Sequence, residues 1–265
     1  MPDIIAPSPE LQPGMREGMG RLKLFDERSL DHSIRRSRLG FWRSLSARVR
    51  TRVNHRAWFQ GNQGNTSQCT AYGVLHAWEA GRGHARGTGR PLAGRPRPLV
   101  SPRTVYVRSQ ELDQWDGSEL VHPFYKGSSG TAAAKALHEM GLITGYDWEF
   151  DDIEVCERAI FTDPLGFGLD WHAGMMLDGA PKVNWSNAII RPDGPVIGGH
   201  FVCAVGFDKK RNGAEWEILN SWGKAWGYGG RCFISRDDLG LLLSRDGECV
   251  MLNEAADADI ATRFP

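Results

Sequence analysis

Three residues, Cys69, His200 and Asn220, have the types and spacing needed for covalent acyl transfer. His200 follows Cys69 by 131 positions and Asn220 follows it by 151. A thiol attacks a carbonyl as its thiolate, and a neighbouring imidazole can take the proton. An amide oxygen can hold that imidazole in one orientation. The set therefore predicts a nucleophile, a base and an orienting residue.

Cys69 stands where a polar, glycine-containing loop over residues 62–68 gives way to a helix. Thr66 and Ser67 are cap-forming residues, and apolar side chains recur at helical spacing at Ala71, Val74, Leu75 and Trp78. A helix amino terminus offers unpaired N–H groups and partial positive charge, which favour the thiolate. We predict a reactive thiol there, although a lone cysteine beside apolar residues is usually a small buried hydrophobe.

The histidine and the asparagine belong to predicted strands. His200 opens a strand over residues 200–208, and Asn220 lies near the end of one over 214–222. Side chains alternate along a strand, so Cys203 is predicted to point away from His200 and into a core. By the same alternation Trp222 flanks Asn220.

These residues resemble the papain-like cysteine peptidases, the C1 family. Gln63 stands six positions before Cys69, as the oxyanion-hole glutamine of that family does before its nucleophile. Residues 220–223 read Asn-Ser-Trp-Gly, a signature of the family, and residues 226–230 match the Trp-Gly-x-x-Gly that follows it. The spacing of Cys69, His200 and Asn220 is also that of papain. The resemblance runs from about residue 56 to 252 and is strongest at its two ends.

The resemblance implies a role for each of these residues in a cysteine endopeptidase. His200 would stabilise the thiolate and protonate the leaving amine, Asn220 would orient its ring, and Gln63 would help hold the oxyanion. Substrate would bind along a cleft at Gly127, Ser128, Ser129, Gly130, Gly199, Trp222 and Trp226. The partner is a peptide or protein substrate, with no metal or cofactor.

The sequence departs from the plant and animal pattern at three positions. Thr66 stands where those enzymes carry a disulfide cysteine, Thr70 replaces an aromatic residue, and Gly199 replaces an aspartate. In this the chain resembles compact bacterial and phage-encoded members of the class. The differences bear on substrate preference more than on chemistry.

The papain resemblance implies an α+β fold with a helical amino-terminal lobe, a β-barrel-like antiparallel carboxyl-terminal lobe and the active-site cleft between them. The pattern itself predicts helices over 102–113, 131–140 and 152–161, then strands over 165–171, 200–208, 214–222, 230–235 and 248–252. We expect an arm over residues 1–55 and a catalytic domain over 56–265, with lobes at about 63–150 and 151–252. Asp113 and Asp116 are interpreted as solvated carboxylates.

Composition indicates an ordinary soluble protein, 41% hydrophobic and 24% charged. Five cysteines without paired spacing argue against a disulfide framework or a zinc site, which fits a reducing compartment. The amino terminus has prolines and acids in place of a signal peptide, and nothing approaches a membrane span. We expect a cytoplasmic protein, with association with a phage as the alternative.

Charge is uneven along the chain. Residues 1–110 hold 19 Lys and Arg against 7 Asp and Glu, and residues 111–265 hold 13 against 25. We interpret the arginine-rich segment over 23–56 as a solvated arm facing the acidic half, and do not expect nucleic acid as a partner. The arm is short for an inhibitory pro-region, and residues 24–28 resemble the first strand of a mature domain. We therefore expect a constitutively competent enzyme.

Three other functions stay open. The chain could be a catalytically silent papain-like domain with a structural or binding role, for example in a phage particle. It could use the same thiol as an amidase or acyl transferase on a nonpeptide amide. It could bind nucleic acid through the arginine-rich arm, which would make binding strongly dependent on salt.

Overall fold

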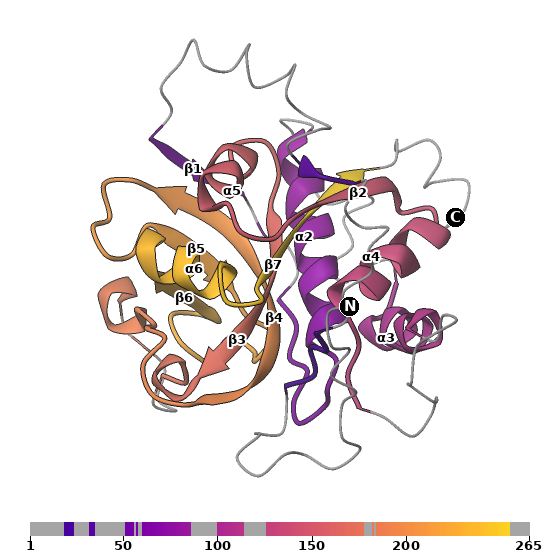
Figure 1. Ribbon diagram of the computed structural model, residues 1–265, viewed down its shortest axis with the longest axis horizontal. Coiled ribbons are helices and arrows are strands. Elements are labelled where there is room, and N and C mark those ends of the chain that lie inside the picture. The colour runs from indigo at the N-terminus through magenta and orange to yellow at the C-terminus, as the bar shows by residue number, and fades with distance from the viewer. Residues whose placement is uncertain are drawn as a thin grey trace.

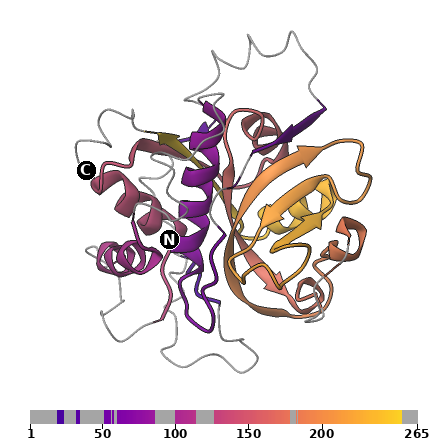
Figure 2. The same ribbon diagram turned by 180° about the vertical axis from the view of Figure 1, so that it is seen from behind.

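The computed structural model describes residues 19–23, 32–34, 51–55, 57, 60–85, 100–113, 126–177, 182 and 184–254. Figures 1 and 2 show two lobes. The helices α2 (Cys69–Ala85), α3 (Pro102–Leu112) and α4 (Gly130–Glu139) form one of them. A curved sheet with α5 (Ile153–Ala159) and α6 (Arg236–Leu243) forms the other, and α2 runs along the boundary.

A seven-stranded antiparallel sheet forms the second lobe. Its order is β2 (Ile143–Glu149), β7 (Glu248–Glu254), β3 (Leu165–His172), β4 (Val196–Asp208), β5 (Trp216–Leu219) and β6 (Arg231–Ile234). The short β1 (Arg52–Asn54) pairs with β4. The outer strands of this order, β2 and β6, do not pair with each other within the described residues. The sheet is therefore open and does not close into a barrel. The predicted α+β, papain-like fold is otherwise confirmed.

Side-chain caps explain where the helices begin. Ser101 accepts a hydrogen bond from the Thr104 backbone and is followed by a proline, Ser129 accepts from Ala132, and Asp152 accepts from Glu154 and Val155. The three predicted helices that follow these caps are confirmed. Two short 3₁₀ turns, η3 (Ala173–Met175) and η4 (Trp185–Ala188), connect β3 to β4.

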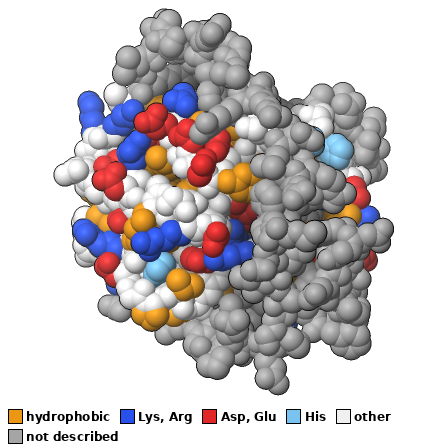
Figure 3. All heavy atoms as spheres, viewed as in Figure 1, with side chains coloured by type: hydrophobic (Ala, Val, Ile, Leu, Met, Phe, Trp, Pro, Cys, Tyr) orange, Lys and Arg blue, Asp and Glu red, His pale blue; other side chains and the backbone are white. Residues whose placement is uncertain are grey.

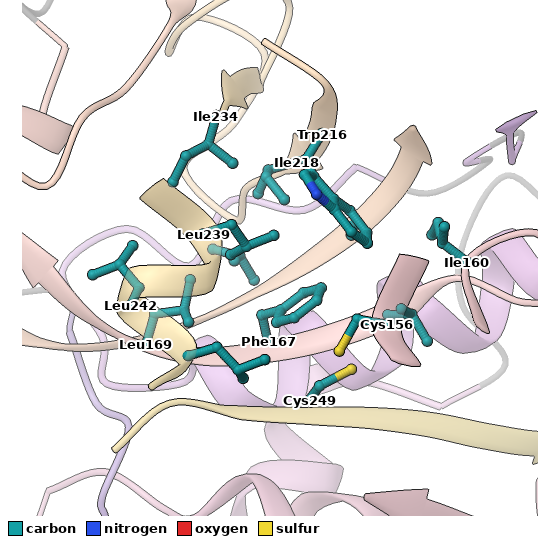
Figure 4. Close-up of a cluster of buried hydrophobic side chains, with 14 of the residues drawn as sticks. Cys156, Ile160, Phe167, Leu169, Trp216, Ile218, Ile234, Leu239, Leu242 and Cys249 are labelled. Carbon is teal, nitrogen blue, oxygen red and sulfur yellow. The ribbon is translucent and has the colours of Figure 1, made fainter. Parts of the chain in front are cut away.

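The two faces of the sheet bury different cores. Phe167, Trp216, Ile218 and Leu239 belong to the core beneath α5 and α6, shown in Figure 4, where Cys156 and Cys249 face one another. Alternate residues of the same strands pack against α2, α3 and α4. In β4, Val202 and Ala204 thus lie in the first core, and Phe201, Cys203 and Val205 in the second. This confirms the predicted orientation of Cys203, and all five cysteines are free and buried.

Several boundaries differ from the predictions. Helix α2 continues to Ala85, beyond Trp78, the last apolar residue from which it was predicted, and its core contacts extend to Ala80. Strand β4 begins at Val196 because β3 pairs with it from there, and β5 ends at Leu219. Strands β1 and β2 and helix α6 were not predicted, and β2 pairs with β7 although it precedes the expected sheet lobe. Residues 24–28, Asp116 and most of the arginine-rich segment lie outside the described residues.

The described surface of the sheet lobe mixes charges of both signs. Blue and red side chains are interspersed over it in Figure 3. Arg236 contacts Glu154, Glu157 and Asp237, and Arg211 contacts Asp208 and Glu217. Many of the acids in this half are therefore paired locally. No described helix is long and apolar enough to cross a membrane.

Candidate active site

Cys69 and His200 come from two elements that pack directly on each other. Cys69 is the first residue of α2, and His200 lies in β4. Gly73 in α2 lies against the Phe201 ring, so a side chain at that position would push the helix away from the strand. The Cys69 thiol makes a backbone hydrogen bond with Phe201, the residue that follows His200. The structure thus places Cys69 beside the residue that follows His200, although Cys69 and His200 are 131 positions apart in the sequence.

His200 and Asn220 form a direct hydrogen bond. The imidazole Nε2 lies 2.8 Å from Asn220 Oδ1, and the Ser221 backbone N–H donates to the same oxygen at 2.7 Å. A carbonyl oxygen only accepts, so Nε2 carries the proton and Nδ1 of the neutral ring is left with its lone pair. Nδ1 is buried and has no hydrogen-bond partner among the described residues. The ring is therefore held as a base by its bond to Asn220.

Aromatic rings cover this pair. Trp222 stacks on the His200 ring with centroids 4.7 Å apart, and Trp171 meets the same ring edge-on at 4.9 Å. Trp226 packs against Trp222 at 5.1 Å and donates through its indole N–H to Met176 O. The rings exclude water from the His200–Asn220 hydrogen bond, which strengthens that bond. Trp222 therefore lies beside the pair, although β5 ends at Leu219 and the strand alternation used to predict its place does not extend to it.

Gln63 connects the nucleophile loop to the asparagine. Its side-chain amide donates to Thr66 O at 2.6 Å, and its carbonyl oxygen accepts from the Ser221 hydroxyl. Its backbone N–H also donates to Ser221 O at 2.8 Å. Since Ser221 follows Asn220, the loop before Cys69 and the segment after β5 are held together beside the site.

Residues 19–23 lie over the thiol. Gly20 makes a backbone hydrogen bond with Cys69, and a Cβ at Gly20 would lie 2.6 Å from the Ser67 carbonyl carbon. A side chain at position 20 would therefore collide with the loop before α2. Cys69, His200 and Asn220 have no exposed surface. In this conformation residues 19–23 of the predicted arm lie against the candidate site of the expected constitutively competent enzyme.

The covering segment is bound as an extended strand through its backbone. Ser128 N–H donates to Gly20 O at 2.8 Å, and Leu22 N–H donates to Ser128 O at 3.0 Å. On the other side Arg21 N–H donates to Gly199 O at 3.1 Å. This is strand addition, a common way for proteins to hold extended peptides. Gly127, Ser128 and Gly199, which were predicted to bind substrate, thus lie against a peptide segment of the chain itself.

A buried ion pair fixes the segment. Arg21 Nε lies 3.1 Å from Glu248 Oε1 at the start of β7, and Arg21 Nη2 donates to Asp246 O at 2.8 Å. Lys23 contacts Asp170 at 2.9 Å in a more exposed position. Because residues 21 and 23 point to the same side of an extended chain, both basic side chains face acidic groups of the sheet lobe.

Asp113 supports the opposite wall of the groove, contrary to its interpretation as a solvated carboxylate. It is buried and accepts hydrogen bonds from the Ser128 hydroxyl, the Ser129 hydroxyl and the Ser129 N–H at 2.8, 2.6 and 3.1 Å. Burial raises its pKa to about 6 while these hydrogen bonds act in the opposite direction. Asp113 thus positions Ser128 and Ser129, and Ser129 in turn caps α4.

Burial sets the protonation of the central pair. It raises the pKa of Cys69 to about 11, against backbone hydrogen bonds from Phe201, Gly20 and Thr70. It lowers the pKa of His200 to about 4, against the hydrogen bond to Asn220. In the covered conformation the pair is therefore a neutral thiol and a neutral imidazole. This differs from the predicted thiolate, because burial removes the water that would stabilise both charges.

Sequence reasoning missed Arg21, Glu248 and the supporting role of Asp113. Arg21 and Glu248 are 227 positions apart, and neither belongs to a motif. The Ser-Ser-Gly sequence at 128–130 was one signal for the role of Asp113, because buried serine hydroxyls need hydrogen-bond partners. Among the described residues no cluster of three or more His, Cys, Asp or Glu could hold a metal ion.

Comparisons with known proteins show which proteins this chain is similar to. A family model described as papain family cysteine protease matches residues 179–256, which include His200 and Asn220 but not Cys69 or Gln63. Over this segment the chain is similar in sequence to the papain family. The chain is 28% identical over 116 residues to the senescence-specific cysteine protease SAG12 of Arabidopsis thaliana. This alignment covers 43% of this chain and 32% of that protein. The chain is 29% identical over 123 residues to cysteine proteinase 3 of Entamoeba histolytica, and the alignment covers 46% of this chain and 38% of that protein.

The alignments span about a third of the length of these curated relatives. Solved structures confirm the papain-like fold. Xylellain, a cysteine protease from Xylella fastidiosa, superposes with a TM-score of 0.68 at 16% identity, covering 93% of this chain and all of that one. The bromelain protease from Ananas comosus, in complex with the E64 inhibitor, superposes with a TM-score of 0.54 at 18% identity. The superposition covers 78% of this chain and 100% of that chain.

Proposed function

We propose that the chain is a cysteine endopeptidase with Cys69 as nucleophile, His200 as base and acid, and Asn220 as the residue that orients the imidazole. The observation that carries this is the hydrogen bond between His200 Nε2 and Asn220 Oδ1. Within the described part of the chain it leaves the basic Nδ1 without a hydrogen-bond partner, on a residue whose neighbour Phe201 contacts the thiol. The matched family model and the papain-like fold support the same activity.

In the proposed reaction the Cys69 proton passes to His200 Nδ1 as the sulfur attacks the peptide carbonyl carbon. A carbon–sulfur bond forms, and the imidazolium then protonates the amine as the carbon–nitrogen bond breaks. Water attacks the resulting thioester with His200 taking its proton. The sulfur leaves, takes back the proton and restores the thiol. Asn220 keeps the ring in place through both halves, since only Nδ1 exchanges protons.

The developing oxyanion needs hydrogen-bond donors. We assign this role to the backbone N–H of Cys69, whose position at the first turn of α2 leaves it outside the helical ladder, and to the Gln63 amide. Gln63 is fixed by Thr66 and Ser221, so its donor is held in place before the reaction. Donors held in this way lower the barrier without having to reorganise.

Residues 19–23 must leave before a substrate enters. They occupy the groove between Ser128 and Gly199 in a conformation in which burial favours the neutral form of the pair. Their departure would hydrate the pair and let the helix amino terminus favour the thiolate. We therefore replace the expectation of a constitutively competent enzyme with one in which the arm limits access.

Peptide hydrolysis by the full chain tests the proposal. A fluorogenic peptide blocked at both ends reports cleavage of an internal bond, and Cys69→Ala should lower its hydrolysis at least ~10⁴-fold because the covalent route is lost. Iodoacetamide followed by mass spectrometry should label Cys69 ahead of Cys156, Cys203, Cys232 and Cys249. Cys232→Ala is the matched control for removal of a buried thiol.

Two results would contradict the assignment. One is faster labelling of any other cysteine than of Cys69. The other is unchanged hydrolysis in Cys69→Ala. Absence of hydrolysis in both the parent chain and the Arg21→Ala variant, in which the arm is loosened, would favour the catalytically silent domain.

A further inference from the structure

Two side chains of α2 bind the loop that precedes this helix. His76 Nε2 accepts a hydrogen bond from the Gly61 backbone N–H at 3.2 Å, and the Tyr72 hydroxyl donates to Asn62 O at 3.1 Å. Tyr72 and His76 follow Cys69 by three and seven positions, so the three side chains share one face of the helix. The face of α2 that carries the thiol therefore also binds the loop.

The same loop pairs with the segment that follows β5. Gly223 N–H donates to Gly61 O at 3.2 Å, and Gln63 N–H donates to Ser221 O at 2.8 Å. Gly61 thus uses its carbonyl for this pairing and its N–H for His76. Because Gln63 follows Gly61 by two residues, these contacts fix its backbone relative to α2.

The hydrogen bonds of the Gln63 side chain act separately from this attachment. They join it to Thr66, which belongs to the same loop, and to Ser221, which belongs to the segment after β5. They fix the amide relative to its own loop and to the sheet lobe. The bonds from Tyr72 and His76 fix the loop relative to α2.

His76 can accept from Gly61 only through an unprotonated Nε2, which places the proton of the neutral ring on Nδ1. Burial lowers the pKa of His76 to about 3, and the positive charge of Arg231 acts in the same direction. The acceptor is therefore present throughout the neutral pH range. His200 has the opposite arrangement, since its Nε2 donates to Asn220.

We propose that Tyr72 and His76 are positioning residues, which set the place of the Gln63 amide relative to the Cys69 thiol. The inference rests on the proposed peptidase function, in which this amide helps hold the oxyanion. Such a donor acts only if it is in place as charge develops, so a small displacement of the loop slows the chemical step. Attachment to α2 ties the donor to the helix that carries the nucleophile.

The test compares three variants of the full chain with the parent. His76→Leu leaves the Gly61 N–H without its acceptor, and should lower kcat for a peptide blocked at both ends ~10-fold with KM within about twofold. His76→Gln supplies a carbonyl oxygen in place of Nε2, and should restore kcat to within about threefold of the parent value. Tyr72→Phe removes an exposed hydrogen bond and should lower kcat about threefold.

Two controls separate positioning from loosening of the fold. Iodoacetamide should alkylate Cys69 in His76→Leu at a rate within about twofold of the parent rate, since this attack forms no oxyanion. His55→Leu is the matched control, because His55 is also buried and bonds a backbone group, Ile160 O at 2.6 Å, beside α5. It should leave kcat unchanged.

A double variant tests whether His76 acts through Gln63. In the Gln63→Ala chain, in which the amide is already gone, His76→Leu should lower kcat by less than about twofold. The same ~10-fold loss in both chains overturns the proposal, because independent effects multiply. An equal fall in alkylation, a failure of His76→Gln to restore kcat, or an equal loss in His55→Leu also overturns it.

Hydrogen exchange distinguishes failure of this inference from failure of the peptidase function. Exchange of the amides of residues 61–63, measured by mass spectrometry of peptic peptides, should rise ~10-fold in His76→Leu and stay unchanged in His76→Gln and His55→Leu. Hydrolysis by the parent chain, with exchange and kcat both unchanged in His76→Leu, overturns the positioning role alone. Absence of hydrolysis in the parent and in Arg21→Ala, with faster exchange in His76→Leu, overturns the peptidase function and leaves the attachment of the loop supported. Absence of hydrolysis with unchanged exchange overturns both.

Discussion

Cys69 and Cys203 are both fully buried thiols, but different parts of the chain bury them. Cys203 lies in the middle of β4, in the core shared with α2, α3 and α4. Cys69 is the first residue of α2, and its thiol has a backbone hydrogen bond from Gly20 of the arm, which packs against Ser67 in the loop before the helix. Burial raises the pKa of both thiols. Both thiols are equally unexposed, but for different reasons. Cys203 is buried by the core, whereas Cys69 lies beneath a bound segment that can leave.

Local environment supports the same distinction. The Cys69 thiol has backbone hydrogen bonds from Phe201, Gly20 and Thr70, and a positive charge nearby at Arg21. The Cys203 thiol donates only weakly, to Ala204 O at 3.6 Å. When residues 19–23 leave and water enters, Gly20 and Arg21 depart, but Cys69 keeps the backbone donors of Phe201 and Thr70, while Cys203 stays in an apolar core. Of these two thiols, Cys69 has the surroundings expected of a reactive cysteine.

Among variants that keep the Cys69 thiol, the largest effects are expected from Gln63→Ala and Asn220→Ala, which disturb the chemistry at Cys69 in different ways. Loss of the Gln63 amide should lower the rate constant of peptide hydrolysis ~10² to 10³-fold with substrate affinity nearly unchanged, since its donor acts on charge in the transition state. Asn220→Ala lets the His200 ring rotate, so both hydrolysis and thiol reactivity should fall.

Alkylation separates the two variants because attack on iodoacetamide forms no oxyanion. Gln63→Ala should alkylate at nearly the parent rate, and Asn220→Ala should alkylate more slowly with a shifted pH profile. Equal alkylation defects would show that Gln63 is structural, acting through its contacts with Thr66 and Ser221.

A smaller effect is expected from loosening the cover itself. Arg21→Ala removes one partner of a buried ion pair, a change that usually costs about 3 to 5 kcal/mol, and so favours departure of the arm. Alkylation of Cys69 should rise ~10²-fold, because its rate follows the open fraction. Cys203 should label at an unchanged, slow rate, measured in the same sample by mass spectrometry.

Lys23→Ala is the matched control on the same segment. Its pair with Asp170 is more exposed, and such pairs contribute about 0 to 1 kcal/mol, so alkylation should rise only a few-fold. A parallel rise in the labelling of Cys203 in Arg21→Ala would indicate general loosening of the fold and contradict a detachable cover.

The sequence predicted the residues of the candidate site more fully than it predicted residues 19–23, which lie over that site. Order and spacing identified Cys69, His200 and Asn220, and strand alternation placed Cys203 in a core, because these features are local or belong to a known pattern. The position of residues 19–23 depends on the pairing of Arg21 with Glu248 and on Gly20 fitting against Ser67. Such contacts between distant residues leave no periodicity in one sequence. The same limit concealed the buried role of Asp113.

The smallest effect is expected from removing each thiol and measuring stability. Cys203→Ala leaves a cavity that the surrounding strand and helix cannot fill, and should cost about 1 to 2 kcal/mol, a fall in Tm of about 2 to 8 °C. Cys69→Ala leaves its cavity beneath a segment that can shift, so a loss below about 0.5 kcal/mol is expected. Thermal unfolding of both variants, followed by circular dichroism, gives the comparison. Equal losses would mean that residues 19–23 are packed on Cys69 as rigidly as the core is packed on Cys203.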